Sequence, residues 1–335
     1  MYFGENVLSM KALITTVPFG ERDRTALDRL EDAGIEYLIN PTGRKLTEPE
    51  LAEMAADFDV LIAGTEPIGR LVMDNAPRLK MISRVGIGLD SVDLLAAKDR
   101  GIVVSYTPDA PAPAVAELTV GLMITLLRSV QTSNLQMHDG KWHRYFGMRL
   151  SNATIGIIGA GRIGSKVIHH LAGFDVSRVL INDRNPKINL DPSVPVTWAD
   201  KETIYREADI ISFHLPLTSE TKDLVRKEQL AMMKDDALIL NTARGGIINE
   251  QDLFESLNSG HLGGAAIDVF KHEPYGGPLT QIDRCVLTAH MGSMSVDCRI
   301  QMEVEATEEA IRFMRKETLL SEVPQDEYDV QSQGI

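Results

Sequence analysis

Three glycines constrain one short segment of this chain more than any other feature does. Gly159, Gly161 and Gly164 stand in the run Gly-Ala-Gly-Arg-Ile-Gly, directly after an apolar strand-like run and at the start of a helical stretch that reaches Leu171. Glycines at this spacing permit a tight turn, a close approach of the backbone to a pyrophosphate, and close packing of the helix on the strand. The amides at the helix N-terminus would face the anion. The segment therefore predicts a strand–turn–helix unit that binds a dinucleotide, and a plain tight turn is the alternative.

The residues after this loop indicate which dinucleotide it binds. The next strand-like run ends in Asp183, about 20 residues further on, where a carboxylate can accept hydrogen bonds from an adenosine ribose. A carboxylate there repels a 2′-phosphate, so NAD is favoured over NADP, although the neighbouring Arg184 could attract that phosphate. A phosphate-binding loop of nucleotide hydrolases is excluded, because the order Ser165-Lys166 reverses the lysine and the hydroxyl that such a loop needs.

Strand-like and helical runs alternate along nearly the whole chain, as in parallel α/β folds. Strands are predicted at 12–16, 60–63, 81–85, 154–159, 178–183, 210–214, 238–241, 264–269 and 285–289, and helices at 25–33, 49–58, 114–129 and 296–315. Three prolines in the run 107–113 break the pattern and mark a domain boundary. We expect two doubly wound parallel-sheet domains: residues 1–108 with 295–335 form a discontinuous substrate-binding domain, and residues 109–294 form a Rossmann domain.

Composition narrows the classes of partner. The chain has 34 Lys and Arg against 48 Asp and Glu, a net charge of −14, and no basic cluster, which disfavours nucleic acids and anionic membranes. The longest apolar run, 118–127, is far short of the roughly 20 residues that cross a membrane. Two cysteines, Cys285 and Cys298, and an N-terminus without a signal-peptide pattern favour the cytoplasm. The first nine residues are expected outside the fold, and the acidic tail 317–335 is expected to be loosely ordered.

Three charged or titratable residues each follow a predicted strand of the second domain: Arg244, Glu273 and His290. The carboxyl ends of parallel strands border one crevice, so these residues can converge there. An arginine can clamp a carboxylate, a histidine can exchange a proton with a hydroxyl, and a carboxylate can orient the imidazole. This set suits the oxidation of a 2-hydroxy acid, and no metal site is expected. Taken singly, each residue could instead be a surface, turn or capping residue.

In these residues the chain resembles the D-isomer-specific 2-hydroxyacid dehydrogenases, which include phosphoglycerate dehydrogenase, glyoxylate and hydroxypyruvate reductases, and D-lactate dehydrogenase. The resemblance extends over about residues 11–316 and implies a flavodoxin-like substrate domain beside the Rossmann domain. It rests on six segments in order: Arg84-Val85-Gly86-Ile87-Gly88-Leu89-Asp90-Ser91-Val92-Asp93, Ala116-Glu117-Leu118-Thr119, Gly156 to Gly164, His214-Leu215-Pro216-Leu217-Thr218, Asn241-Thr242-Ala243-Arg244-Gly245-Gly246, and Asp268-Val269-Phe270 with Glu273-Pro274.

The resemblance implies a role for each matching residue. Arg244 would hold the substrate carboxyl and keto oxygens, His290 would be the acid/base, and Glu273 would raise the basicity of His290. The resemblance assigns the other positions as follows: substrate, Arg84; substrate carboxylate, the amides of Val85, Gly86 and Ile87; pyrophosphate, Gly159, Gly161, Arg162, Ile163 and Gly164; ribose, Asp183; adenosine, Leu215 and Pro216; nicotinamide carboxamide, Asp268; nicotinamide pocket, Thr242, Ala243, Gly292 and Ser293, with Arg244 and His290 beside them. It also implies a homodimer formed through the nucleotide domain.

The substrate is a small 2-hydroxy or 2-keto acid, and several remain open. Arg84 matches a phosphate-binding position of phosphoglycerate dehydrogenases, and 3-phosphoglycerate is the foremost single candidate beside hydroxypyruvate and glyoxylate. However, where many of those enzymes carry an arginine, this chain has Gly64-Thr65-Glu66, and a glutamate there would oppose a phosphate. Two other readings of the same fold are an NAD(H)-sensing corepressor-like binding protein and a dehydrogenase of formate or phosphite.

Overall fold

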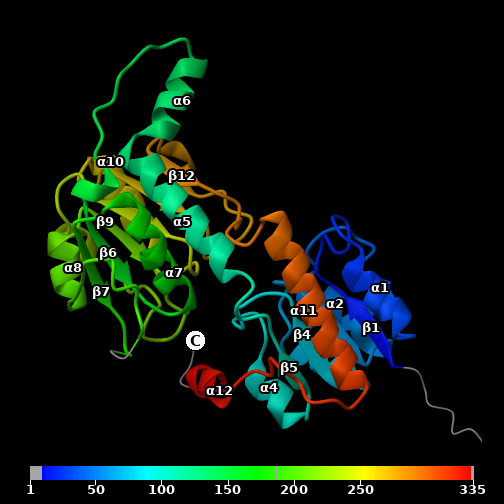
Figure 1. Cartoon of the computed structure of the whole chain (residues 1–335). Coiled ribbons are helices and arrows are strands. Elements are labelled where there is room, and N and C mark those ends of the chain that lie inside the picture. Colours follow the sequence, from blue (N-terminus) through cyan, green and yellow to red (C-terminus); the bar gives the residue numbers. More distant parts are fainter. Residues whose placement is uncertain (1–9, 186–187, 333–335) are drawn as a thin grey trace, which may run out of the picture. The chain divides into compact units, whose positions relative to one another are not determined.

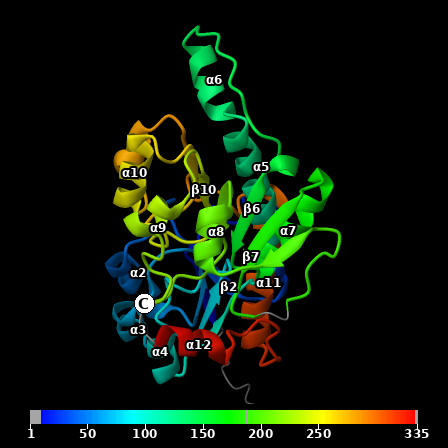
Figure 2. The ribbon, with the colours of Figure 1, turned by 90° about the vertical axis from the view of Figure 1, so that its left-hand side faces the viewer.

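A computed structural model describes residues 10–185 and 188–332, so the expectation for the first nine residues lies outside the described part. The described chain divides into two compact units. Unit 1 contains residues 10–111 and 295–332, and unit 2 contains 112–185 and 188–294. Each unit holds one parallel sheet with helices on both faces (Figures 1 and 2). The predicted fold class of two doubly wound parallel-sheet units is therefore confirmed.

Unit 1 is built on a five-stranded parallel sheet with the order β2-β1-β3-β4-β5, which is the flavodoxin-like order. Its strands are β1 (Lys11–Ile14), β2 (Glu36–Ile39), β3 (Val60–Ala63), β4 (Met81–Arg84) and β5 (Val103–Ser105). The register pairs Ile14 with Ile39 and Ile62, and Ala63 with Arg84, so the strands end side by side. The loops that follow β1, β3 and β4 therefore leave the sheet at one edge.

Helices cover both faces of this sheet. They are α1 (Thr25–Asp32), α2 (Glu48–Met54) with the 3-10 turn Ala55–Asp57, α3 (Arg70–Asn75), α4 (Leu94–Asp99), α11 (Val296–Met314) and α12 (Gln325–Ser332). One set of alternating strand residues, which includes Leu13, Leu61 and Ile82, packs against α2, α3 and α4. On the other face α11 lies against β3 and β4 beside α1, and the Ser83 hydroxyl donates to the Ala306 carbonyl oxygen of α11.

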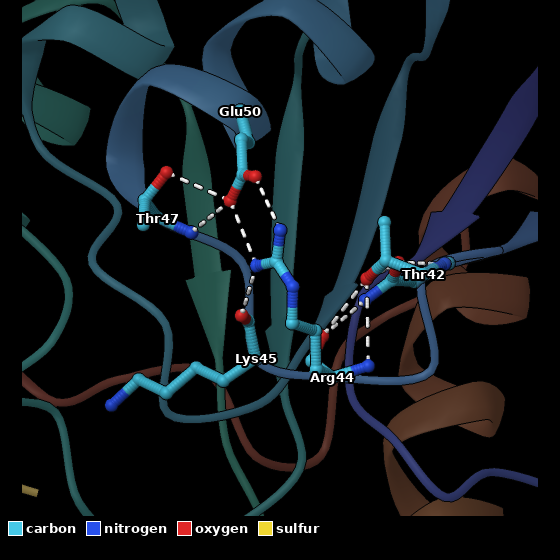
Figure 3. A network of polar contacts seen from close by, with 6 residues as sticks. Thr42, Arg44, Lys45, Thr47 and Glu50 are labelled. Atoms are coloured by element: carbon cyan, nitrogen blue, oxygen red, sulfur yellow. Dashed lines mark hydrogen bonds and ion pairs between the residues drawn. The ribbon is translucent and has the colours of Figure 1, made fainter. Parts of the chain in front are cut away.

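A side-chain network fixes the start of α2, and Figure 3 shows it. The Glu50 carboxylate accepts hydrogen bonds from the backbone amide and the hydroxyl of Thr47, at 2.9 and 2.8 Å. It also accepts two from the Arg44 guanidinium. These donors lower the pKa of Glu50 to about 2. The Glu50 carboxylate lies in the first turn of α2, where the helix dipole also favours negative charge. Both effects stabilise the N-terminus of α2.

The prediction of a loosely ordered tail was wrong over 317–332. Glu309 of α11 accepts the backbone amides of Leu320 and Ser321, and Val323 is buried. Gln331 of α12 accepts the Leu94 amide at the start of α4 at 2.6 Å and donates to the Val92 carbonyl at 2.8 Å. The acidic composition concealed these specific polar contacts, which tie the tail to unit 1 without a large apolar face.

Unit 2 is built on a seven-stranded parallel sheet with the order β12-β11-β10-β9-β6-β7-β8. Its strands are β6 (Thr154–Ile158), β7 (Arg178–Asn182), β8 (Val196–Trp198), β9 (Ile210–Phe213), β10 (Leu238–Asn241), β11 (Gly264–Ile267) and β12 (Cys285–Leu287). This is the Rossmann order with a seventh strand, β12, added next to β11. The point at which the order reverses lies between β6 and β9.

The helices of unit 2 form two layers, and Figure 2 shows α7 on one side of the sheet and α8 on the other. They are α5 (Ala112–Leu127), α6 (Val130–His138), α7 (Arg162–Leu171), α8 (Lys201–Glu207), α9 (Lys227–Met232) and α10 (Glu250–Ser259), with 3-10 turns at Leu150–Asn152, Ala172–Phe174 and Pro278–Gln281. Helix α5 packs against α7, β10 and β11, and its apolar residues are largely buried. Helix α6 has no buried residue and projects away from the sheet (Figure 1).

Within the described residues, no single helix is long and apolar enough to cross a membrane. The pair formed by α5 and α6 meets the test by length and composition, but it is bent by 65° at the break. Both cysteines are buried as free thiols, Cys285 in unit 2 and Cys298 in unit 1. Burial raises the pKa of the Cys285 thiol to about 12 and that of Cys298 to about 11.

Candidate active site

The seven-stranded sheet brings the predicted site residues of unit 2 to one edge. Its register pairs Ile158 with Asn182 and Phe213, and Asn241 with Phe213 and Ile267, so these strands all end at one level. The residues that follow the strand ends therefore stand next to one another along this edge. In sheet order they are Thr288, Asp268, Thr242, His214, Gly159 and Asp183.

The glycine loop after β6 needs its glycines at two positions for packing. A Cβ on Gly159 would meet the His214 carbonyl oxygen at 2.3 Å, and one on Gly164 would meet the Gly159 carbonyl oxygen at 2.0 Å. Gly161 differs, because a Cβ there would meet nothing within 4 Å. Gly161 is the N-cap of α7, so space remains above the helix N-terminus, where an anion can approach the amides. Exposed Arg162 begins α7, followed by half-buried Ile163, and this cradle fits a pyrophosphate.

Asp183 is half-buried beside the glycine loop. Its Oδ2 accepts the Ala160 amide at 2.7 Å, and its Oδ1 accepts the Asn185 amide at 2.8 Å. The carboxylate therefore holds the glycine loop as well as standing at the predicted ribose position. His214, between the ends of β6 and β10, has Nε2 2.9 Å from the Ser212 hydroxyl, and burial lowers its pKa to about 3. This imidazole is neutral, so it adds no positive charge behind the loop.

His290 and Glu273 form the central pair of the candidate site. His290 Nδ1 lies 3.0 Å from Glu273 Oε2, and Glu273 Oε1 accepts the Phe270 amide at 3.1 Å. The pair is partly open, since the side chains are 39% and 28% exposed. A carboxylate on Nδ1 fixes the imidazole so that Nε2 is the nitrogen left for proton exchange, and it stabilises the imidazolium.

Arg244 follows β10 in a loop that approaches the Glu273 segment closely. A Cβ on Gly245 would overlap the Phe270 backbone at 2.0 Å, so glycine allows these two loops to touch. The Arg244 carbonyl accepts the Asn241 amide group at 2.8 Å, and the Arg244 guanidinium donates to the Ala243 carbonyl at 2.7 Å. The structure thus gathers Arg244, Glu273 and His290 at the edge formed by β10, β11 and β12.

Asp268 holds the loop that carries His290. The carboxylate is 1% exposed and accepts the Thr288 hydroxyl at 2.6 Å, the Met291 amide at 2.7 Å and the Gly292 amide at 2.9 Å. His290 itself has a φ of +52°, in the left-handed region that residues other than glycine adopt in only a few per cent of cases. Asp268 was predicted to contact a nicotinamide carboxamide, whereas here both of its oxygens already accept bonds from its own chain.

The other predicted cofactor residues lie along the same edge. Buried Thr242 shares a hydrogen bond of 2.9 Å with buried Thr119 of α5, a pairing that the sequence did not predict. The remaining positions are buried Ala243 and Gly292, half-buried Leu215 and Ser293, and exposed Pro216. Thr119 stands in the Ala-Glu-Leu-Thr segment, which was the one sequence signal that could have identified it.

The predicted substrate loop follows β4 in unit 1. Arg84 is 5% exposed and donates through Nη1 to the carbonyls of Ala63 and Val85, at 3.3 and 2.6 Å. Gly86 has a φ of +140°, and a Cβ there would meet this guanidinium at 3.2 Å. The loop differs from the prediction in its amides: Val85 donates to the Ala63 carbonyl and Gly86 to the Thr107 hydroxyl, both at 2.8 Å. Two of the three amides predicted to bind the substrate are thus used by the fold itself. The third, the Ile87 amide, has no acceptor among the described residues.

Comparison with known proteins identifies the family to which the chain belongs. The model of the D-isomer specific 2-hydroxyacid dehydrogenase NAD binding domain matches residues 120–292, which lie within unit 2. Together with relatives over 30% identical along most of their length, this match shows that the chain belongs to the D-isomer specific 2-hydroxyacid dehydrogenase family. It is an oxidoreductase of 2-hydroxy acids that uses a nicotinamide cofactor.

Two relatives and one solved structure illustrate the range of the family. The chain is 34% identical to hydroxypyruvate reductase of Thermotoga maritima, over 85% of this chain and 96% of that protein. It is 35% identical to D-3-phosphoglycerate dehydrogenase of Methanocaldococcus jannaschii, over 92% of this chain but 58% of the relative. The TT0316 protein of Thermus thermophilus matches 94% of this chain and all of its own, with a TM-score of 0.85 and 35% identity. Among the described residues, no group of three or more His, Cys, Asp or Glu could hold a metal ion.

Proposed function

We propose that this chain catalyses the NAD-dependent interconversion of a short D-2-hydroxy acid and its 2-keto acid. The observation that carries the proposal is the His290–Glu273 pair, with Nδ1 and Oε2 3.0 Å apart, beside Arg244 at the strand ends of the unit that matches the NAD binding domain. The candidate substrates are hydroxypyruvate, glyoxylate and 3-phosphohydroxypyruvate. A formate or phosphite dehydrogenase would not need an acid/base paired in this way.

In the proposed reaction each of these side chains has its own step. A bound nicotinamide supplies or accepts the hydride at the substrate C2. Arg244 holds the carboxylate and the keto oxygen of the substrate, because a guanidinium offers a planar fork of donors. In reduction His290 donates the Nε2 proton to the keto oxygen as that oxygen gains charge, and Glu273 stabilises the imidazolium before transfer. In oxidation His290 accepts the proton back from the hydroxyl.

A keto-acid panel tests the reaction class. Purified protein with NADH or NADPH is mixed with hydroxypyruvate, glyoxylate, pyruvate and 3-phosphohydroxypyruvate, and the loss of absorbance of the reduced cofactor is followed. We expect turnover with at least one keto acid and a preference for NADH, since Asp183 repels a 2′-phosphate. A folded protein that binds NADH but turns over none of the four acids would contradict the proposal.

Replacing the acid/base is the sharper test. His290→Asn removes the imidazole and keeps the loop, because asparagine tolerates a positive φ. We expect kcat to fall on the order of 10²-fold or more while the Kd for NADH stays within a few-fold. His169→Asn, on the exposed last turn of α7, is the matched control and should leave kcat unchanged. An undiminished kcat in His290→Asn would remove His290 from the mechanism.

We also propose that the protein is a homodimer formed through unit 2. Its support is the projecting α6 and the segment that follows, which expose large apolar side chains: Leu135, Met137, Trp142, Phe146 and Met148. Exposed apolar groups of this extent are typical of protein–protein contacts. Sedimentation of the wild type and of Trp142→Ala with Phe146→Ala would test it, with a shift toward monomer expected for the double variant.

A further inference from the structure

A buried carboxylate stands at the edge of the five-stranded sheet where β3 ends. Glu66 is 2% exposed, and its Oε1 accepts the Gly64 amide at 2.8 Å and the Thr15 hydroxyl. Its Oε2 accepts no hydrogen bond from a described residue. A Cβ on Gly64 would meet this Oε2 at 2.8 Å and the Thr16 hydroxyl at 2.9 Å, so glycine allows both groups to approach the Gly64 backbone closely. One oxygen of Glu66 thus holds the fold, and the other, beside Gly64, keeps its capacity to accept a hydrogen bond.

Glu66 lies beside the predicted substrate loop. The peptide group between Ala63 and Gly64 is held at both ends: its carbonyl accepts from Arg84, and its amide donates to Glu66. The same carbonyl accepts the amide of Val85, the first residue of the loop after β4. Glu66 and the loop are therefore separated by one peptide group, within a single unit.

The charges around Glu66 leave its carboxylate without an ion pair among the described residues. From β4, the buried Arg84 donates to the carbonyls of Ala63 and Val85, and from α11, Arg299 donates to the Thr16 hydroxyl at 2.9 Å. However, Arg299 is paired with buried Glu303 at 2.7 Å, so this pair adds no net positive charge. A buried carboxylate without an ion pair is costly to fold, and Oε2 takes no part in the two hydrogen bonds by which Oε1 holds the fold, so this oxygen indicates a second use for Glu66.

We propose that Glu66 sets the substrate class of the reaction proposed above: a 2-keto acid with a hydroxyl on C3 and without a phosphate. A C3 hydroxyl can donate a hydrogen bond to Oε2, whereas a phosphate has only acceptors and negative charge to offer. Hydroxypyruvate fits this description, glyoxylate lacks C3, and 3-phosphohydroxypyruvate is opposed. This inference rests on the proposed function, because it needs the loop after β4 to bind the substrate.

The test compares three keto acids in Glu66→Gln, which keeps the shape and removes the charge. We expect kcat/KM to fall about 10-fold for hydroxypyruvate, to rise about 10-fold for 3-phosphohydroxypyruvate, and to stay within about 3-fold for glyoxylate, since a hydrogen bond to a charged group is worth about a factor of ten. Glu53→Gln, on an exposed position of α2, is the matched control. Equal falls for all three acids would show a purely structural role and overturn the proposal, as would an unchanged order of preference.

A measurement on the wild type keeps the proposal testable if Glu66→Gln does not fold. D-Glycerate and 3-phosphoglycerate are compared as inhibitors of glyoxylate reduction, and we expect D-glycerate to inhibit at a concentration at least about 10-fold lower. Stronger inhibition by 3-phosphoglycerate would overturn the proposal. Failure of the proposed function would look different, because the wild type would then reduce none of the keto acids.

Discussion

Two loops at the edge of the seven-stranded sheet are held by the same device and differ in what they leave open. The glycine loop after β6 is bonded by Asp183, which follows the neighbouring strand β7. The His290 loop after β12 is bonded by Asp268, which follows the neighbouring strand β11. Asp183 is half-buried and accepts one hydrogen bond at each oxygen, whereas Asp268 is 1% exposed and accepts hydrogen bonds from three donors.

This difference in burial and bonding indicates different roles for the two carboxylates, one in binding a ligand and the other in positioning a loop. A half-buried carboxylate can exchange a backbone amide for a ribose hydroxyl, so Asp183 can serve both the loop and a ligand. A buried carboxylate with both oxygens bonded has little to offer a ligand, and its value lies in fixing His290 in a left-handed backbone conformation. We therefore expect Asp183 to act in cofactor binding and Asp268 to act in positioning His290.

The largest effect is expected from Asp268→Asn. The amide nitrogen of asparagine cannot accept the Gly292 or Met291 amide, so a buried donor loses its partner and the loop shifts. We expect kcat to fall on the order of 10²-fold, since a displacement of about 1 Å at a reacting group can cost that much, while the Kd for NADH changes little. Asp283→Asn, exposed before β12, is the control. A near-normal kcat with weak NADH binding would show that Asp268 acts on the cofactor, and it would contradict the distinction between Asp268 and Asp183.

A pair of alanine variants separates the structural from the ligand-facing glycines of the other loop. In Gly164→Ala the new Cβ overlaps the Gly159 carbonyl, and we expect a loss of about 2 kcal/mol in the free energy of unfolding together with weaker NADH binding. In Gly161→Ala the Cβ meets nothing and the φ of −67° is ordinary, so stability should be kept.

Only NADH affinity should then fall in Gly161→Ala, by about 10-fold, because the Cβ occupies the space of the pyrophosphate. Thermal unfolding and NADH fluorescence titration measure the two quantities. If Gly161→Ala bound NADH as well as the wild type, the space above the N-terminus of α7 would not be the anion site.

The smallest effect is expected from Asp183→Asn. Loss of one charge-assisted hydrogen bond should raise the Kd for NADH by about 3- to 10-fold, and removing the repulsion should narrow the preference over NADPH. Asp175→Asn is the control, because Asp175 is exposed and its φ of +51° suits asparagine. A Kd for NADH that rose as much as kcat falls in Asp268→Asn would remove the distinction between the two loops.

The interior strands of both sheets could be predicted from the sequence, whereas of the four edge strands only β12 was predicted. The missed strands β2, β5 and β8 are each at the edge of a sheet, and β2 alternates between exposed and half-buried residues. Trp198 of β8 is 42% exposed. A strand covered on one face lacks the continuous apolar run that marks a central parallel strand. The exposed helix α6 was missed because it has no buried residue and so no apolar face in its sequence.

The candidate site divides in a similar way. Residues placed directly after central strands, such as Arg244 and His290, were predictable because the sheet register aligns the strand ends. Hydrogen bonds that complete a loop could not be predicted. Thr107, for example, was considered only as part of the proline-rich boundary, whereas its hydroxyl accepts a hydrogen bond from the Gly86 amide. The sequence therefore predicted which residues meet at the edge of the sheet. It did not predict which backbone amides there already donate hydrogen bonds within the fold.

The two buried thiols make the protein suitable for site-specific labelling. Maleimide and iodoacetamide reagents react with the thiolate, and with pKa values raised to about 12 and about 11, Cys285 and Cys298 carry almost none near neutral pH. A cysteine introduced on the surface of each unit would thus be modified selectively, with no native residue replaced. A single fluorophore at such a position would report on one chosen unit of the intact enzyme.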